Sequence, residues 1–136
     1  MLQGRRVAVL GGVRIPFCRQ NTAYADVGNL GMSVRTLGAL VEKFGLHGQQ
    51  LGEVAMGAVI KHSSDWNLGR EAALSSGLSP LTPGITLQRA CGTSLDTINL
   101  IATKIATGQI ESGIGGGSDT TSDVPIVYGK SLRRRL

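Results

Sequence analysis

Apolar and polar positions along this chain form blocks that predict strands and helices in alternation. Near-continuous apolar runs over residues 6–16 and 53–60 are typical of strands buried on both faces, as central parallel strands are. Two further strands are expected over residues 85–90 and 112–119, the second of them rich in glycine. Between these runs the apolar residues recur at helical spacing. The chain is therefore expected to contain four strands, with a helix after each of the first three.

The helical blocks carry recognisable start and stop signals. Helices are expected over residues 30–44 and 68–76, and from Leu95 to a C-cap at Gly108. Asn67 can cap the second helix, and Gly45 and Gly77 can end the first and the second. The third helix has only two charges, Asp96 and Lys104, which favours burial on several sides.

The order of the elements predicts the fold class. Strands that alternate with helices imply an α/β fold with a mostly parallel sheet, right-handed crossovers and helices on both faces. Ligands of such sheets gather at the carboxyl ends of the strands, where the loops that begin at Pro16, Lys61 and Ser118 are expected. Residues 120–136 contain no clear element, so we expect a last strand whose edge is covered by a partner or by more protein.

Composition narrows the class further. With 136 residues, 41% hydrophobic and 17% charged, the chain fits one globular domain, and 4% aromatic residues predict an aliphatic core. We expect no membrane span and no signal peptide. The two cysteines, Cys18 and Cys91, lack the spacing of a metal site and fit a reducing compartment better than a disulfide scaffold. A cytoplasmic location is therefore expected, or the mitochondrial matrix if the chain is eukaryotic.

The positive charge of the chain does not predict a nucleic-acid partner. Arg133–Arg135 supply three of the net +5 charges, and no stacking aromatics are interleaved with the other basic residues. Solvated charge near a chain end accounts for the net positive charge better than a nucleic-acid surface does.

The segment richest in chemistry is the strand, cysteine and helix over residues 84–108. Cys91 stands at the junction, where unpaired N–H groups and the helix dipole favour an anion and thus a nucleophilic thiolate. A buried structural cysteine is the alternative. His62 is a candidate base, because its loop is expected at the same sheet edge, but shared topology does not establish contact. Gly113–Gly117 precedes no clear helix, so it favours close packing over dinucleotide binding.

Four stretches, in order along the chain, carry a family resemblance. They are Val7–Phe17, Val54–Ile60, Leu87-Gln-Arg-Ala-Cys-Gly-Thr-Ser-Leu95, and Gly115–Asp119 with Pro125. Together they resemble the amino-terminal part of thiolases, the acyl-CoA C-acyltransferases, and Thr22–Asp26 resembles the branch of trifunctional beta subunits. Gln88 stands where the family usually has Asn, Thr93-Ser94 where it has Ser-Gly, and Asp119 where it has Glu.

The resemblance implies a fold and an activity. Residues 1–119 would form most of a three-layer half-domain, incomplete at its C-terminal end, and residues 120–136 a frayed tail or the start of the family's loop domain. Cys91 would be the catalytic nucleophile of an enzyme of fatty-acid metabolism. It would take an acyl group from a 3-oxoacyl-CoA as a thioester, and coenzyme A, a substrate and not a bound cofactor, would then accept that group.

The resemblance also implies partners and an absence. Thiolases form dimers, so the resemblance implies a homodimer or homo-oligomer, with residues 84–90 as the candidate interface. A partner subunit of a fatty-acid-oxidation complex is a further candidate partner. The Gly-His-Pro and Cys-x-Gly motifs of the family's second half do not occur here, so we expect a fragment without turnover. The alternatives are another member of the superfamily, a ketosynthase or sterol-carrier thiolase-like protein, and a non-catalytic α/β assembly module with Cys91 structural.

Overall fold

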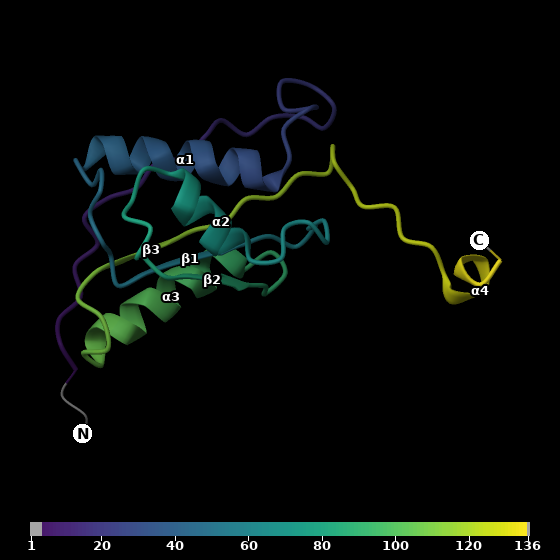
Figure 1. Ribbon diagram of the computed structural model, residues 1–136. Coiled ribbons are helices and arrows are strands. Elements are labelled where there is room, and N and C mark those ends of the chain that lie inside the picture. Colours follow the sequence, from purple (N-terminus) through teal and green to yellow (C-terminus); the bar gives the residue numbers. More distant parts are fainter. Residues whose placement is uncertain (1–3, 136) are drawn as a thin grey trace.

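A small parallel sheet lies between helices on both of its faces (Figure 1). The computed structural model describes residues 4–135. In chain order its elements are α1 (Asn29–Lys43), β1 (Glu53–Gly57), α2 (Leu68–Ser75), β2 (Gly84–Leu87), α3 (Thr93–Ala106), β3 (Gly113–Gly115) and α4 (Lys130–Arg133). Helices α1 and α2 cover one face of the sheet and α3 covers the other (Figure 1). The predicted three-layer α/β class is confirmed.

Strand β1 occupies the centre of the sheet. Its order is β2-β1-β3, and both pairings are parallel, with Val54 opposite Gly84 on one side and Ile114 on the other. All five residues of β1 are buried. The continuous apolar run predicted a strand that is covered on both faces, and β1 has that environment.

The core forms between β1 and the two helices on one face. Its members are aliphatic or small, as the low aromatic content predicted: Leu37, Val41, Leu51, Val54, Met56, Ala72, Ala73 and Leu78. On the other face, Lys104 of α3 forms an ion pair with Glu53 of β1, and both side chains are largely buried. A charge pair in this position holds α3 against the central strand.

The helix boundaries follow the predicted signals. The Asn67 side chain caps α2 by accepting a hydrogen bond from the Arg70 N–H at 3.1 Å. Gly45, Gly77 and Gly108 follow α1, α2 and α3 with φ of 63°, 91° and 75°. Glycine adopts this left-handed conformation without steric cost, which is why it ends helices so often.

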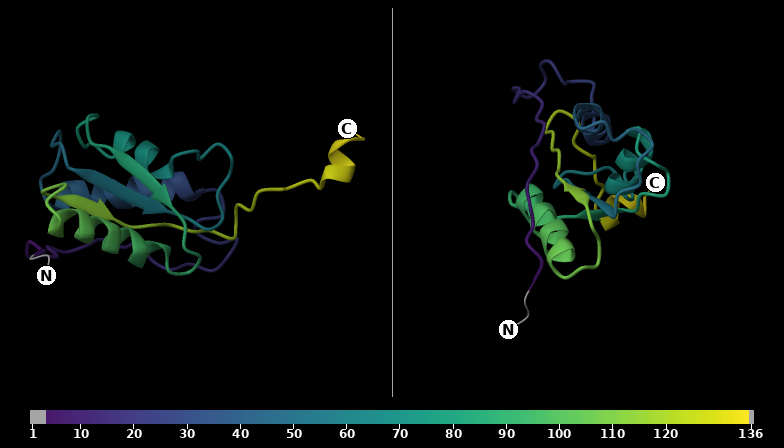
Figure 2. Two further views of the ribbon diagram at one scale, coloured as in Figure 1. Left: turned by 90° about the horizontal axis from the view of Figure 1, so that it is seen from below. Right: turned by 90° about the vertical axis from the view of Figure 1, so that its left-hand side faces the viewer.

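The amino-terminal segment departs from the prediction. Residues 6–16 form no strand, and Val9 and Leu10 are 85% and 83% exposed. An apolar run indicates a preference for burial, but a strand also has to be hydrogen-bonded to a neighbouring strand, and residues 6–16 pair with neither outer strand of the sheet, β2 or β3. The segment instead runs beside α3 toward α1 (Figure 2), with the Arg5 N–H donating to the Ala106 carbonyl at 2.8 Å.

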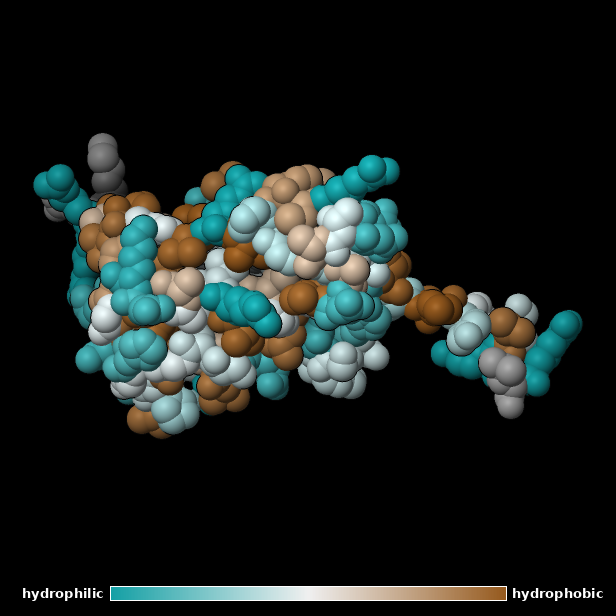
Figure 3. Space-filling model, turned by 90° about the horizontal axis from the view of Figure 1, so that it is seen from above, coloured by the Kyte–Doolittle hydropathy of each residue, from teal (hydrophilic) through white to brown (hydrophobic). Residues whose placement is uncertain are grey.

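The remaining strands are shorter than predicted, because the ladder extends only as far as both partners remain adjacent. Pairing ends at Gly57 and Leu87 on one side of β1 and at Gly115 on the other. Beyond β3 the chain leaves the sheet and leads to α4, which has no buried residue (Figure 1). Figure 3 shows hydrophobic side chains on the segment that leads to α4, where Ile126 and Val127 are 82% and 85% exposed.

Two helical glycines give a test of the packing. A Cβ on Gly69 would lie 2.2 Å from the Ile85 carbonyl oxygen, whereas the nearest atom to a Cβ on Gly38 is 3.8 Å away. Because α2 would be pushed off β2, we expect Gly69→Ala to lower the free energy of unfolding by about 2–3 kcal/mol. Gly38→Ala should raise it by about 0.5–1 kcal/mol, since alanine favours the helix. Urea unfolding followed by circular dichroism measures both, and equal effects would contradict the packing.

Candidate active site

A cavity of about 640 Å³ opens where the parallel strands end. Most of its wall comes from four segments, within residues 13–20, 57–60, 90–94 and 117–122. The loops that begin at Pro16 and Ser118 therefore lie at the predicted edge of the sheet. The loop that begins at Lys61 instead borders a neighbouring hollow of about 420 Å³.

Cys91 lies on the wall of this cavity, at the junction of a strand and a helix. It is exposed, and it comes two residues before the start of α3 at Thr93, with Gly92 as the N-cap. No side chain caps this helix end. The thiol is thus close to the positive end of a fourteen-residue helix, as predicted, and an anion is favoured at such a position.

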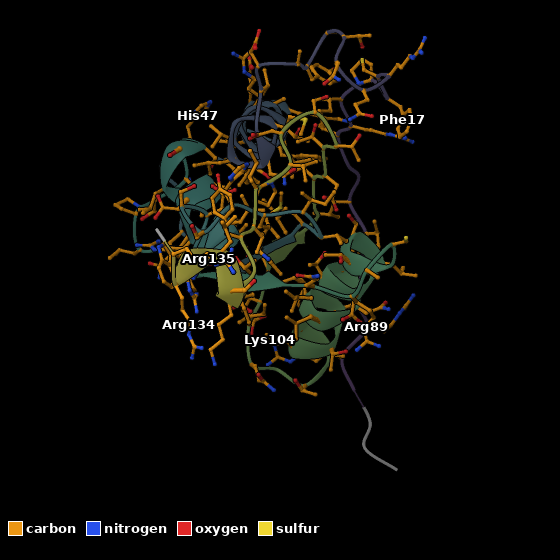
Figure 4. All side chains as sticks on the ribbon, turned by 90° about the vertical axis from the view of Figure 1, so that its right-hand side faces the viewer. Phe17, His47, Arg89, Lys104, Arg134 and Arg135 are labelled. Atoms are coloured by element: carbon orange, nitrogen blue, oxygen red, sulfur yellow. The ribbon has the colours of Figure 1, made fainter. Side chains whose placement is uncertain are left out.

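The turn before Cys91 has an unusual backbone. Ala90 has φ of 41°, one of two positive values among the described non-glycine residues. The hydroxyl of Thr93 accepts a hydrogen bond from the Arg89 N–H and donates one to the Ala90 carbonyl, both at 2.8 Å. Arg89 lies beside α3 (Figure 4), and its Nε donates to Asp96 Oδ2 at 2.9 Å.

The opposite wall is held together by Asp119. Its carboxylate accepts hydrogen bonds from the Val59 N–H at 2.7 Å and the Ile60 N–H at 2.9 Å. The loop after β1 is thereby tied to the segment after β3. In sequence, Asp119 stood out only as a departure from the family's usual Glu. Its backbone partners are about 60 residues away in the sequence, so no local residue pattern could have predicted these hydrogen bonds.

A buried polar cluster supports the same wall from α1. Asn29 is 4% exposed, and its Nδ2 donates to the Ile60 carbonyl. The Ser118 hydroxyl donates to the Asn29 carbonyl at 3.0 Å and is hydrogen-bonded to the Ser33 hydroxyl at 2.8 Å. Among these residues only Ser118 was expected at this edge of the sheet, as the first residue of its loop, and neither Asn29 nor Ser33 was predicted there. The only available signal was a polar side chain at the first position of an amphipathic helix.

The glycine-rich run after β3 allows close approach of the backbone. A Cβ on Gly117 would lie 2.7 Å from both the Gly57 carbonyl oxygen and Ser94 Oγ. A side chain here would therefore force the end of β1 and the start of α3 apart. Tight packing was the predicted use of these glycines, and it is confirmed.

The second thiol borders the same cavity from the amino-terminal segment. Cys18 is half-buried and lies beside Tyr24. The pKa of Tyr24 is raised above its ordinary value of 10.0. The largest cause is desolvation, and the charge of Cys18 and its hydrogen bond to Tyr24 add to it. The Tyr24 phenol is therefore a neutral hydrogen-bonding group at physiological pH.

Neither histidine lines the wall beside Cys91. His62 borders the neighbouring hollow, where its Nε2 lies 2.9 Å from Asp123 Oδ1. His47 packs near Gly77 and lies far from Phe17 of the cavity wall (Figure 4). The structure thus does not bring the candidate base His62 together with Cys91.

Two further properties concern residues 4–135 only. No three histidine, cysteine or acidic side chains in this part of the chain are grouped so as to hold a metal ion. Among its helices, none combines the length and the apolar character needed to cross a membrane.

Comparisons with known proteins agree on one family. Residues 7–136 match the model of the thiolase N-terminal domain. The chain is 37% identical to a 3-ketoacyl-CoA thiolase of Photorhabdus laumondii and 34% identical to one of Cronobacter sakazakii, in each case over 98% of this chain and 31% of the relative. It therefore spans less than a third of the length of these relatives.

A solved structure has the same fold. The crystal structure of the Bacillus anthracis acetyl-CoA acetyltransferase superposes with a TM-score of 0.77 over 88% of this chain and 29% of that protein, at 26% identity. The α/β sandwich, the strand–Cys91–helix junction and these matches lead to one assignment. The chain belongs to the thiolase family and corresponds to its amino-terminal domain.

Proposed function

We propose that this chain is the nucleophile-bearing part of a thiolase and that Cys91 is its catalytic nucleophile. The observation that carries the proposal is the exposed thiol on the cavity wall, at the amino end of α3, within the family's amino-terminal domain. Relatives named 3-ketoacyl-CoA thiolase support a 3-oxoacyl-CoA as the substrate.

The chemistry requires two acyl transfers. The Cys91 thiolate attacks the C3 carbonyl of the 3-oxoacyl-CoA, the C2–C3 bond breaks, and a proton delivered to C2 gives acetyl-CoA. The sulfur of a second coenzyme A then attacks the acyl-Cys91 thioester and takes the acyl group, and the proton from its thiol passes to the Cys91 sulfur, which regenerates the free cysteine. We expect the N–H groups at the amino end of α3 to donate hydrogen bonds to the oxyanion that develops on the attacked carbonyl.

The proton transfers need groups from outside these 136 residues. His47 and His62 are the only histidines of the sequence, and neither lines the cavity beside Cys91. We therefore propose that the chain by itself carries the nucleophile but completes no catalytic cycle. On this view residues 1–119 are the α/β part of the half-domain, and residues 120–136 lead toward a loop domain.

The alternatives differ in what they require of Cys91. A non-catalytic assembly module would have a buried, inert cysteine, and the exposure of Cys91 speaks against that reading. A ketosynthase or a sterol-carrier thiolase-like protein would use the same nucleophile. The relatives named as 3-ketoacyl-CoA thiolases favour thiolysis over these two.

A homo-oligomer and a reducing location complete the proposal. Strand β2 lies at an edge of the sheet, so a second copy could extend the sheet through residues 84–90. Cys18 and Cys91 are free thiols, which suits the cytoplasm or the mitochondrial matrix. A partner subunit of a fatty-acid-oxidation complex is a further candidate for contact with the chain.

Selective alkylation tests the role of Cys91. In the native chain, iodoacetamide should modify Cys91 about 10-fold faster than Cys18, because only Cys91 is both exposed and next to a helix amino end. Peptide mass spectrometry at timed intervals gives both rates in one sample, so Cys18 is the internal control. Equal rates would contradict the nucleophile role.

A turnover assay tests the missing base. The purified chain should give no steady thiolysis of acetoacetyl-CoA above that of its Cys91→Ala variant, because no histidine lines the cavity beside the thiol. Loss of absorbance of the magnesium enolate measures the rate, with a full-length 3-ketoacyl-CoA thiolase as the positive control. Sustained turnover that depends on Cys91 would show that the chain holds a complete site.

The oligomer is tested at the edge strand. We expect light scattering to give the mass of a dimer, and Ile85→Lys on β2 to convert it to a monomer, because a lysine on an edge strand opposes pairing. Leu81→Lys is the matched control, since Leu81 is 71% exposed and lies outside the strand. A monomeric unmodified chain at high concentration would count against the interface.

A further inference from the structure

The backbone next to Cys91 is held in a conformation that alanine rarely adopts. Ala90 has φ of 41°, in the left-handed region, although it is exposed and has a Cβ. For a residue with a side chain this conformation is strained, so the surrounding contacts have to maintain it. The orientation of this turn decides where the next residue, Cys91, presents its thiol.

One hydroxyl group closes the turn from both ends. Thr93 is 5% exposed, and its Oγ1 accepts from the Arg89 N–H and donates to the Ala90 carbonyl, both at 2.8 Å. Two backbone bonds reinforce it, from the Gly92 N–H to the Arg89 carbonyl at 2.9 Å and from the Thr93 N–H to the Ala90 carbonyl at 3.2 Å. The side-chain hydroxyl thus bonds to the peptide group before Arg89 and to the peptide group after Ala90, and so spans both residues of the turn.

The methyl group of Thr93 fixes this hydroxyl in turn. A Cβ placed on Gly57 would lie 2.4 Å from Thr93 Cγ2, so the methyl packs directly against the end of β1. A second contact at the turn, between Arg89 and Asp96, has its arginine side chain 72% exposed. Exposed ion pairs contribute little to the fixing of geometry, so the buried hydroxyl is the stronger restraint.

We propose that Thr93 is a positioning residue for Cys91: through the Ala90 turn its hydroxyl holds the thiol at the amino end of α3. This rests on the proposed function, in which Cys91 is the nucleophile. Without the hydroxyl, Ala90 relaxes to an ordinary conformation, the thiol leaves the helix end, and the thiolate loses the support of the N–H groups there. Serine supplies the same hydroxyl, so threonine in place of the family's usual serine preserves both hydrogen bonds of the turn.

Three variants of the full chain test this, with the alkylation rates of Cys91 and Cys18 as the readout. Thr93→Val keeps the size of the side chain and removes the hydroxyl, and it should slow alkylation of Cys91 about 10-fold while the rate at Cys18 is unchanged. Thr93→Ser should stay close to the original rate. Asp96→Asn, the matched control, breaks the exposed ion pair of the same turn and should leave the rate unchanged.

A fourth variant separates positioning from folding. Because glycine adopts the left-handed conformation freely, Ala90→Gly added to Thr93→Val should recover much of the Cys91 rate and of the melting temperature. If Thr93→Val alone fails to fold, the Cys91 alkylation rate is measured on this double variant instead.

The outcomes are distinct. A lower melting temperature with an unchanged ratio of Cys91 to Cys18 rates would reduce Thr93 to a structural residue and overturn the proposal. So would a double variant that folds without recovery of the rate. If Cys91 reacts no faster than Cys18 in the unmodified chain, the proposed function itself fails, and the role of Thr93 fails with it.

Discussion

The structure depends on one constraint, which is the complete enclosure of β1. Both edges of this strand are hydrogen-bonded and all of its residues are buried, so every neighbouring element packs directly against it. Since all three strands are parallel, their carboxyl ends emerge at one edge of the sheet. Cys91 after β2, Gly57 at the end of β1 and Gly117 after β3 are therefore brought together by topology before any side chain is considered.

Close packing then converts this shared edge into a site with defined geometry. Gly57 leaves no room for a side chain, because a Cβ there would lie 2.1 Å from the Leu87 carbonyl and 2.4 Å from the methyl of Thr93. The end of β1 thus packs against Leu87, before the turn that carries Cys91, and against Thr93, after it. Across the cavity, Asp119 binds two N–H groups of the loop after β1. The end of β1 and the loop that follows it thus contact both walls of the site.

The sequence predicted what depends on local pattern and missed what depends on distant partners. Apolar spacing and the glycines placed α1, α2 and α3 within a few residues, and the strand–Cys91–helix junction was predicted correctly. The predicted amino-terminal strand was wrong, because hydrophobicity shows a preference for burial but not whether a segment pairs with another strand. Thr93 and Asp119 were noted only as family departures, since their hydrogen bonds to backbone groups cannot be read from residue type.

The arrangement separates two physical tasks that a thiolase has to combine. In the proposed function fixed dipoles hold the nucleophilic sulfur, and Cys91 comes two residues before the start of α3. Moving protons requires groups that change charge next to the sulfur, and His62 is instead paired with Asp123 in another hollow. A nucleophile can be positioned by a few neighbouring residues, whereas a proton relay has to converge on the substrate from several directions. In the proposed function the first task therefore falls to this half-domain.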